Sequence, residues 1–543
     1  MFYMELIVVD YKNQLKKFKK VSSVNELLVT NSRECKDLIA LQFTKKNQIV
    51  NVTYGELKEH VCGLGEGLYA KGIKDTKVAI LGPNSYEWIL SFFTVISGFN
   101  VAVPLDRELE SESLAEIINE SGCTAIIYDN SYSDIIEDLR KVCPKLCEYI
   151  NMKNLEEMTL KTEDDSYIDN NIDIDSLGLI VYTSGTSGKS KGVMLRRKSV
   201  VIDSYAASQN VTLGYKTVLV LPLHHTFCMA ASLITSMIQR RTVYINSSLK
   251  RLMSDIETAK PQDISLVPLF VETLSKKIWS EIDKKNKTKL VKFMIKVSNA
   301  LLAVGIDIRK KVFKDIHAVF GGRLDFIISG GALLDTKYIK EFRSFGIDIV
   351  NGYGISECSP IISVNENDKN KVGSVGRILP GVQVKISDEG EILVKGDIVM
   401  MGYFNDEAET EKAFIDGWFR TGDLGYIDEE GFLYVTGRIK NLIILANGKN
   451  VSAEELELKI QNIDAVCEVV VYEKDNKIVA EIYPDYEWLE NNGVQDIEGY
   501  IQKEVDSLNR TIAQYKRINE IKFRSEEFVK TTTKKIKRNL ISK

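Results

Sequence analysis

The chain has 543 residues, of which 44% are apolar and 27% are charged, values typical of a globular protein with more than one domain. Its 71 Lys and Arg residues stand against 76 Asp and Glu residues, and the net charge of -5 excludes a chain-wide basic field for nucleic acid. Any anion that the protein binds must therefore meet a local site.

The first ten residues form an apolar stretch that Glu5 interrupts, and this stretch is too short for a signal peptide. The longest uncharged run, Ile89 to Leu105, falls short of the about 20 apolar residues that a membrane span needs. It predicts a buried helix followed by a strand, and no transmembrane segment is expected. The eight cysteines are scattered without the spacing of a metal site, which indicates reduced thiols in a cytoplasmic protein.

Short β-rich runs alternate with helical patterns through the first four-fifths of the chain, which predicts a layered α/β fold with largely parallel sheets. A helix is expected after Thr53, because apolar residues recur at helical spacing from Leu57 to Leu68. The expected strands include 77–81, 124–128, 177–182, 217–221, 324–328 and 347–350. Several of them end in loops rich in Gly, Ser or His, and ligands of such folds bind at the carboxyl ends of strands.

After about residue 437 the pattern changes to that of a smaller α+β domain. Ser452 and Glu455 predict a capping box, followed by a helix with Leu456, Ile460 and Ile463 on one face. The runs 465–472 and 477–483 predict a β-hairpin.

The segment from Tyr182 to Val193 directly follows an apolar strand and has the composition of a phosphate-binding loop. Its two glycines let backbone amides approach an anion, its hydroxyl groups supply donors, and Lys189 and Lys191 supply positive charge. The spacing excludes a Walker A loop, because position 183 would have to be Gly and is Thr. Taken alone, the segment is also compatible with a flexible surface turn.

This segment resembles the phosphate-binding loop of the superfamily of acyl- and aryl-CoA synthetases, luciferases and nonribosomal adenylation enzymes. Further motifs of that superfamily follow in the same order along the chain, so the resemblance spans roughly residue 53 to the C-terminus. They are Leu221–Phe227, Ser329–Ala332, Asn351–Glu357, Gly417–Asp423, Gly437–Lys440 and Thr531–Arg538.

The resemblance implies a role for each matched residue. The ATP phosphates would be bound by Thr183, Ser184, Gly185, Thr186, Ser187, Gly188 and Lys189. The adenine and its surroundings would involve Gly330, Gly331, Ala332, Asn351, Gly352, Tyr353, Gly354 and Ser356, with the Tyr353 ring stacked on the base. Glu357 and Thr183 would hold Mg²⁺, Asp423 would bind the ribose hydroxyls, and His225 would lie near the acyl pocket.

The same chemistry can be argued from charge. A carboxylate that attacks the α-phosphate meets like-charge repulsion, so cations are needed where negative charge develops. Lys189, Arg438, Lys535 and Mg²⁺ would supply them, and a single carboxylate such as Glu357 suits Mg²⁺. Lys535 is the preferred catalytic lysine, although Lys534 stands where the superfamily commonly has Gly.

The resemblance also implies an architecture of a large N-terminal domain, residues 1–437, a hinge at 438–441, and a mobile C-terminal domain, 442–543. Rotation about Lys440 would withdraw Lys535 and present the loop around Gly448 to a thiol.

The segments Leu221–Phe227 and Phe320–Ala332 most resemble those of bacterial medium- to long-chain fatty acyl-CoA synthetases. The predicted function is therefore that of an ATP-dependent acyl-CoA synthetase acting on a carboxylic acid, with a fatty acid as the expected substrate. ATP and Mg²⁺ would serve the first step and coenzyme A would be the acceptor of the second. Two alternatives stay open. The acyl group could pass to the phosphopantetheine of an acyl carrier protein, or the chain could be a nucleotide-binding protein without catalysis.

Overall fold

The computed structural model describes residues 18–161, 165–168, 171–184, 190–246, 248–445, 449–530 and 536–541. The apolar stretch 1–10, the loop residues 185–189, Gly448, Lys534 and Lys535 lie outside these ranges, as does the Ser184 side chain. The described chain divides into two compact units, and the division along the sequence falls within β7, β16, β17 and β20. Each unit is described by itself.

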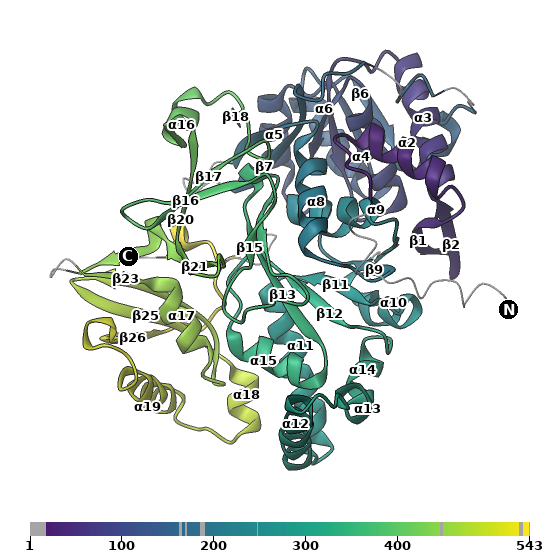
Figure 1. Cartoon of the computed structure of the whole chain (residues 1–543). Coiled ribbons are helices and arrows are strands. Elements are labelled where there is room, and N and C mark those ends of the chain that lie inside the picture. The colour runs from purple at the N-terminus through teal and green to yellow at the C-terminus, as the bar shows by residue number, and fades with distance from the viewer. Residues whose placement is uncertain are drawn as a thin grey trace. The chain divides into compact units, whose positions relative to one another are not determined.

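The larger unit contains two extended sheets (Figure 1). The seven-stranded sheet has the order β18 (Gly402–Tyr403), β8 (Ser190–Arg196), β7 (Leu177–Ser184), β4 (Val101–Pro104), β3 (Lys77–Leu81), β5 (Ala125–Tyr128) and β6 (Glu148–Asn151). The nine-stranded sheet has the order β15 (Arg377–Ile378), β14 (Ile361–Val364), β13 (Asp348–Gly354), β12 (Phe326–Ser329), β11 (Asp263–Leu266), β9 (Lys216–Leu219), β10 (Thr242–Ile245), β1 (Ile39–Lys45) and β2 (Gln48–Thr53).

The pairing within these sheets is mainly parallel, as the alternation of strands and helices predicts. β3 pairs in parallel with β4 and β5, and β9, β10, β11, β12 and β13 form a continuous parallel block. Parallel strands need crossover connections, and helices supply most of them here. These strands are therefore largely buried on both faces, and most of their side chains are apolar, although polar residues such as Thr217, Asp263 and Ser265 are buried there too.

The helices of the larger unit pack against these sheets. They are α2 (Val24–Glu34), α3 (Tyr54–Ala70), α4 (Tyr86–Ser97), α5 (Ser111–Ser121), α6 (Ser133–Val142), α7 (Leu155–Met158), α8 (Ser199–Asn210), α9 (Thr235–Ile238), α10 (Leu252–Ala259), α11 (Pro268–Lys284), α12 (Thr288–Ala303), α13 (Arg309–Val312), α14 (Lys314–Val319), α15 (Thr336–Phe345) and α16 (Glu407–Lys412), with a π-helix, η4, at Cys228–Ile234.

Two of these elements confirm local predictions in detail. The Thr53 hydroxyl accepts from the Glu56 amide and the Glu56 carboxylate accepts from the Thr53 amide, so α3 begins with a full capping box. The uncharged run 89–105 forms most of the buried helix α4 and then β4. None of the helices in the described ranges has both the length and the apolar character that a membrane crossing needs.

The smaller unit consists of short sheets and three helices. Its elements, with the strands at the division, are β16 (Gln383–Ile386), β17 (Glu391–Lys395), β20 (Trp418–Ile427), β21 (Leu433–Arg438), β22 (Leu442–Ile444), β23 (Asn450–Ser452), α17 (Ala453–Gln461), β24 (Val466–Lys474), β25 (Lys477–Pro484), α18 (Tyr486–Asn491), α19 (Ile497–Asn509) and β26 (Glu520–Phe523). The short strand β19 (Phe414–Ile415) belongs to the larger unit and pairs with β20.

The predicted hairpin of this unit is confirmed. β24 and β25 are antiparallel, and Lys474 faces Lys477 across a two-residue turn. Asp475 and Asn476 both have positive φ, which matches the twist of the paired strands. The predicted capping box is only half correct. Ser452 accepts from the Glu455 amide, but the Glu455 carboxylate pairs with Lys516.

Candidate active site

The predicted phosphate loop begins where β7 ends. Thr183 is the last but one residue of this strand, and the next strand, β8, begins at Ser190. The loop therefore leaves the sheet at the carboxyl end of a parallel strand. The part that would contact phosphate, Gly185 to Lys189, lies outside the described residues and its role stays a prediction. Lys191, which the sequence adds to the positive charges of the loop, instead forms an ion pair with Glu409.

The two segments predicted to border adenine lie side by side. Ser329 is the last residue of β12, and it pairs in parallel register with Asn351 of β13. Gly330 and Gly331 follow β12 directly, and Ala332 continues the same loop. Segments separated by about 20 positions in the sequence thus meet at one edge of the nine-stranded sheet.

Glycine is required in this region because other chain segments approach closely. Gly331 has a φ of 86°, a left-handed conformation that few other residues adopt. A Cβ added at Gly354 would lie 1.8 Å from the carbonyl oxygen of Pro360, which is a backbone atom. The matched motif therefore reflects packing as well as any contact with a nucleotide.

Glu357 is held in place within a short 3₁₀ turn, Ser356–Cys358. The Met400 amide donates to the Glu357 carbonyl oxygen at 2.8 Å, and the Tyr403 hydroxyl donates to Oε1 at 3.1 Å. Burial and the negative charge of Glu357 raise the pKa of Tyr403, so this hydroxyl stays protonated and donates. Among the described residues, Oε2 accepts no hydrogen bond. A fixed, half-buried carboxylate with one oxygen available fits a ligand of Mg²⁺.

The predicted histidine motif forms a tightly held loop. The side-chain amide of Asn84 donates to the Leu221 carbonyl oxygen at 2.8 Å and accepts from the Leu223 amide at 3.0 Å. His224 is buried, as expected, and its Nε2 lies 3.3 Å from Oδ1 of Asp106. Its ring centroid is 4.2 Å from that of His225.

The histidines and Asp106 also have the composition of a metal site, since their ligand atoms lie within 4.8 Å of one another. Burial, the neighbouring His225 and the positive charge of Arg107 all lower the pKa of His224. His224 is therefore neutral at physiological pH. The same arginine charge opposes a cation, so the cluster fits a structural role better than a metal centre.

A cavity that is partly open to solvent lies beside the Gly330 and Gly352 backbones. Its lining is almost entirely apolar and comes from α8, the π-helix region, β12, β13 and β14. The lining residues are Ala207, Val211, Leu213, Phe227, Ala231, Thr235, Ile328, Gly330, Gly331, Gly352, Tyr353, Gly354, Pro360, Ile361 and Val364. His225, predicted near the acyl pocket, is not among them, whereas Phe227 of the same motif is.

The π-helix shapes one wall of this cavity. Phe227, Ala231 and Thr235 recur every four residues, close to the wider turn of a π-helix, so all three face the cavity. The Thr235 hydroxyl donates to the Ala230 carbonyl oxygen at 2.8 Å. No charged side chain is present among the described lining residues.

The turn after α8 contributes to the lining of the cavity. Val211 and Leu213 line the cavity, and Gly214 of the same turn donates its amide to Asp263 at 3.1 Å. Asp263 is level with Phe326 in the sheet, four residues before Gly330, which corresponds to about 13 Å of strand. The turn and the glycine loop therefore lie at different levels along the strands.

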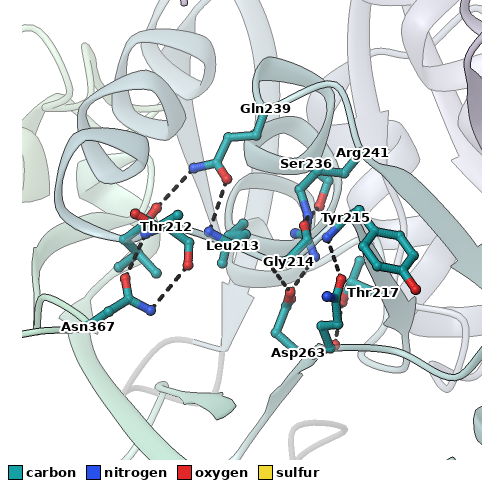
Figure 2. Close-up of polar contacts among 12 residues, drawn as sticks. Thr212, Leu213, Gly214, Tyr215, Thr217, Ser236, Gln239, Arg241, Asp263 and Asn367 are labelled. Carbon is teal, nitrogen blue, oxygen red and sulfur yellow. Dashed lines mark hydrogen bonds and ion pairs between the residues drawn. The ribbon is translucent and has the colours of Figure 1, made fainter. Parts of the chain in front are cut away.

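Side-chain amides fix this turn from two sides (Figure 2). Gln239 donates to the Val211 carbonyl oxygen at 2.9 Å and accepts from the Leu213 amide at 3.1 Å. Asn367 accepts from the Thr212 amide at 2.7 Å and donates to its carbonyl oxygen at 3.1 Å. These four hydrogen bonds pair the backbone groups of the turn beside the cavity.

In the smaller unit, Asp423 and Arg438 face each other on β20 and β21. Asp423 is buried, and its Oδ1 lies 2.8 Å from Nε of Arg438. From the sequence motifs, Asp423 is predicted to bind the ribose hydroxyls and Arg438 to supply positive charge near the phosphates. The structure adds an ion pair between these two side chains. Lys440 follows two residues later in a short 3₁₀ turn.

Two side chains that hold residues of the site in place could not be predicted from the sequence. Tyr403 orients Glu357, yet an isolated Tyr in a short strand has no recognisable motif. Asp203 is fully buried on α8 and accepts from the amide of Ile361, a cavity-lining residue, at 3.1 Å. Burial raises the pKa of Asp203 well above its usual range, and the hydrogen bond from the Ile361 amide opposes this rise. Asp203 lies in a helix that also buries Ser199, Ser204 and Ser208, so no local pattern in the sequence singles it out.

The chain is similar to several proteins of named function. Long-chain-fatty-acid–CoA ligase FadD15 of Mycobacterium bovis is 28% identical over 487 residues, which cover 83% of this chain and 80% of that protein. The chloroplastic long-chain-fatty-acid–[acyl-carrier-protein] ligase AEE15 of Arabidopsis thaliana is 26% identical over 551 residues, with coverage of 84% and 75%.

Among solved structures, the anthranilate CoA ligase AuaEII in complex with anthranoyl-AMP aligns over 97% of each chain with a TM-score of 0.78. At 19% identity this likeness shows the fold, which is that of adenylate-forming enzymes. The family model described as AMP-binding enzyme matches residues 28–404, well over half of the chain. The chain therefore belongs to the AMP-binding enzyme family.

Proposed function

We propose that this protein activates a fatty acid with ATP, forming an acyl-adenylate and pyrophosphate, and then transfers the acyl group to coenzyme A. The observation that supports the fatty acid is the apolar cavity that ends beside the Gly330 and Gly352 backbones. An acid whose tail fills this cavity places its carboxylate at the strand ends where the family motifs cluster.

The chemistry of the lining favours an alkyl tail over a polar or aromatic acid. The hydroxyl of Thr235 already donates to the Ala230 carbonyl, and the described lining offers no charged partner for a substituent. Each methylene group moved from water into such a site gains about 0.8 kcal/mol. Acetate and benzoate would leave much of the cavity unfilled, so longer chains gain affinity that these acids lack.

ATP would lie along the segments Gly330–Ala332 and Asn351–Gly354, with its phosphates toward the loop 183–189. Glu357 and Thr183 would hold Mg²⁺, which when bound supplies positive charge beside the phosphate oxygens. Tyr403 keeps the Glu357 carboxylate in one orientation through the 3.1 Å hydrogen bond to Oε1. Asp423 would accept from the ribose hydroxyls, and Arg438, which pairs with it, would hold that carboxylate in place.

Two conformations would serve the two steps. In the first, Lys535 would bridge the carboxylate and the α-phosphate, and Lys189 would add charge at the phosphates. In the second, the C-terminal domain, residues 442–543, would rotate about the hinge at 438–441 and bring the loop around Gly448 toward the thiol. The motifs support this division of roles.

Acyl carrier protein is the alternative acceptor, and the likeness to a ligase named for that acceptor favours keeping it. The direct test is a panel of carboxylic acids assayed for acid-dependent ATP–pyrophosphate exchange, followed by addition of CoA or of a carrier protein. Exchange with fatty acids and thioester formation with CoA is the expected result. Exchange confined to aryl acids would refute the fatty acid, and the absence of exchange with every acid would favour a nucleotide-binding protein without catalysis.

Glu357→Ala is expected to weaken Mg²⁺-ATP binding at least tenfold and to leave AMP binding within about twofold, because a metal carboxylate acts on the phosphates. Asp423→Ala should weaken both nucleotides, since both contain the ribose. Calorimetric titration of each variant with ATP, in the presence of Mg²⁺, and with AMP measures the difference. Equal losses of ATP and AMP affinity in Glu357→Ala would contradict the metal role.

A further inference from the structure

Helix α12 has two apolar faces, and only one of them packs against the protein. Val291, Met294 and Ile295 contact the core beneath the helix, where α12 packs against α11 and α15 (Figure 1). On the other side Leu290, Phe293 and Val297 are exposed, and the Phe293 side chain is 63% exposed. Their spacing of three and four residues places them on one stripe, which Val304 extends just beyond the helix.

Lysines border this stripe. Lys289, Lys292 and Lys296 have the same helical spacing, and at 100° per residue they fall along one flank of the exposed apolar side chains. We call these three lysines, together with Leu290, Phe293, Val297 and Val304, the α12 surface. The arrangement is an apolar strip beside a band of positive charge.

Among the residues that the structure describes, none of these three lysines forms an ion pair with a carboxylate. No Asp or Glu occurs between residues 284 and 306, although the whole chain has a net charge of -5. The acidic residues closest in sequence have other partners, because Asp283 accepts a hydrogen bond from the Thr288 hydroxyl, Glu281 pairs with Lys284, and Asp307 pairs with Arg309. The positive potential of the α12 surface is therefore a local feature of an acidic protein.

We propose that the α12 surface docks on an anionic lipid bilayer. An interfacial helix buries a strip of Phe and Leu at the level of the headgroups, while lysines beside it meet the lipid phosphates. Lysine stems are long enough to lie along apolar surface and keep their ammonium groups among those phosphates. On such a bilayer, both the apolar side chains and the lysines of the α12 surface would have a binding partner.

A second copy of the chain is a poorer occupant. A twofold contact centred on α12 would set the same patch against itself, so Lys289, Lys292 and Lys296 would meet the same lysines of the other copy. Like charges at that distance repel. A bilayer with anionic headgroups offers the complementary charge instead.

Co-sedimentation with phosphatidylcholine vesicles, prepared with and without phosphatidylglycerol, tests the proposal in the absence of ATP and acid. The wild-type protein should bind the vesicles that contain phosphatidylglycerol at least tenfold better, and raised salt should weaken this binding. Replacing Lys289, Lys292 and Lys296 by Gln should lower the partition coefficient about a hundredfold, from roughly fivefold per lysine. Phe293→Ser should lower it about tenfold.

Matched controls remove similar groups elsewhere. Ile49→Ser removes an exposed apolar side chain from β2, and Gln at Lys46, Lys71 and Lys161 removes three exposed charges. These variants should bind vesicles as the wild type does. All variants should support the same acid-dependent exchange with a short soluble acid, which shows that they fold.

Equal binding to both kinds of vesicle would overturn the proposal, as would α12 variants that bind like the wild type. A wild-type dimer that Phe293→Ser converts to monomers in sedimentation velocity would assign the surface to a second copy and would overturn it too. Because vesicle binding is measured without substrates, its failure is distinct from a failure of the fatty acid assignment.

Discussion

Replacing Lys535 by Ala is expected to slow formation of the acyl-adenylate about 10²- to 10³-fold, by analogy with the removal of one preorganised charge-stabilising donor. The same variant, supplied with synthetic acyl-adenylate, should form thioester from CoA at a rate within about twofold of the wild type. The reason is that a lysine on a mobile domain acts only in the conformation that places it over ATP. Pyrophosphate exchange and single-turnover thioester formation measure the two steps separately.

Lys534→Ala is the matched control, because it removes the neighbouring charge from the same segment and should leave both steps within about threefold of the wild type. A bulky residue at Gly448 should show the opposite pattern to Lys535→Ala, with adenylation kept and thioester formation impaired. If Lys535→Ala slows thioester formation from supplied adenylate as much as adenylation, the two-conformation account fails.

Arg241→Met is expected to lower the free energy of unfolding of the larger unit by about 3–5 kcal/mol, the usual effect of removing one partner of a buried ion pair. Arg241 and Asp263 are each about 1% exposed, and Arg241 also donates to Ser236 at 3.0 Å and to the Gly214 carbonyl oxygen. Burial raises the pKa of Asp263, and the Arg241 charge opposes that rise. Without it the carboxyl is left buried with no cation beside it. Urea unfolding followed by tryptophan fluorescence measures the loss.

The neighbouring residue supplies the control. Arg240 pairs with Glu34 at the surface, where ion pairs contribute between zero and about 1 kcal/mol, so Arg240→Met should have little effect. A loss of similar size in the two variants would mean that the ion pair and its network do not account for the stability of this region. Because the network also fixes the turn 211–214, Arg241→Met should broaden the range of acids accepted by whatever protein remains folded.

The sequence predicted those elements whose cause is local. Thr53 and Glu56 fix the start of α3 with two reciprocal hydrogen bonds between residues three apart. The two-residue turn at Asp475 and Asn476 is an equally local cause of the hairpin. Parallel strands were also predictable, since their apolar runs alternate with helices. The motifs at Ser329 and Asn351 were recognisable because each is a short segment with characteristic glycines, and because the motifs occur in the same order as in the superfamily.

The remaining features depend on residues distant in the sequence. The cavity is assembled from α8, the π-helix, β12, β13 and β14, and no local pattern reveals that Ala231 and Val364 line the same space. Competition between several possible partners for one side chain cannot be read from the sequence either. Glu455 was expected to complete a capping box, but Lys516 lies within reach and takes its carboxylate. Lys191 was expected to face phosphate, but it pairs with Glu409.

The central claim is that the apolar cavity holds the acyl chain, and filling the cavity tests it most directly. Ala231 lines the cavity from the π-helix, so Ala231→Phe should shorten the space available to a tail. The measurement is kcat/KM for ATP–pyrophosphate exchange with butyrate, octanoate and palmitate, in the wild type and in Ala231→Phe. For the shortest acid that the wild type accepts, kcat/KM of Ala231→Phe should stay within about threefold of the wild-type value. For the longest acid it should fall at least tenfold, because one displaced methylene group already costs about 10-fold or more in such pockets. Equal losses for all three acids, or an unchanged preference for the longest, would contradict the account.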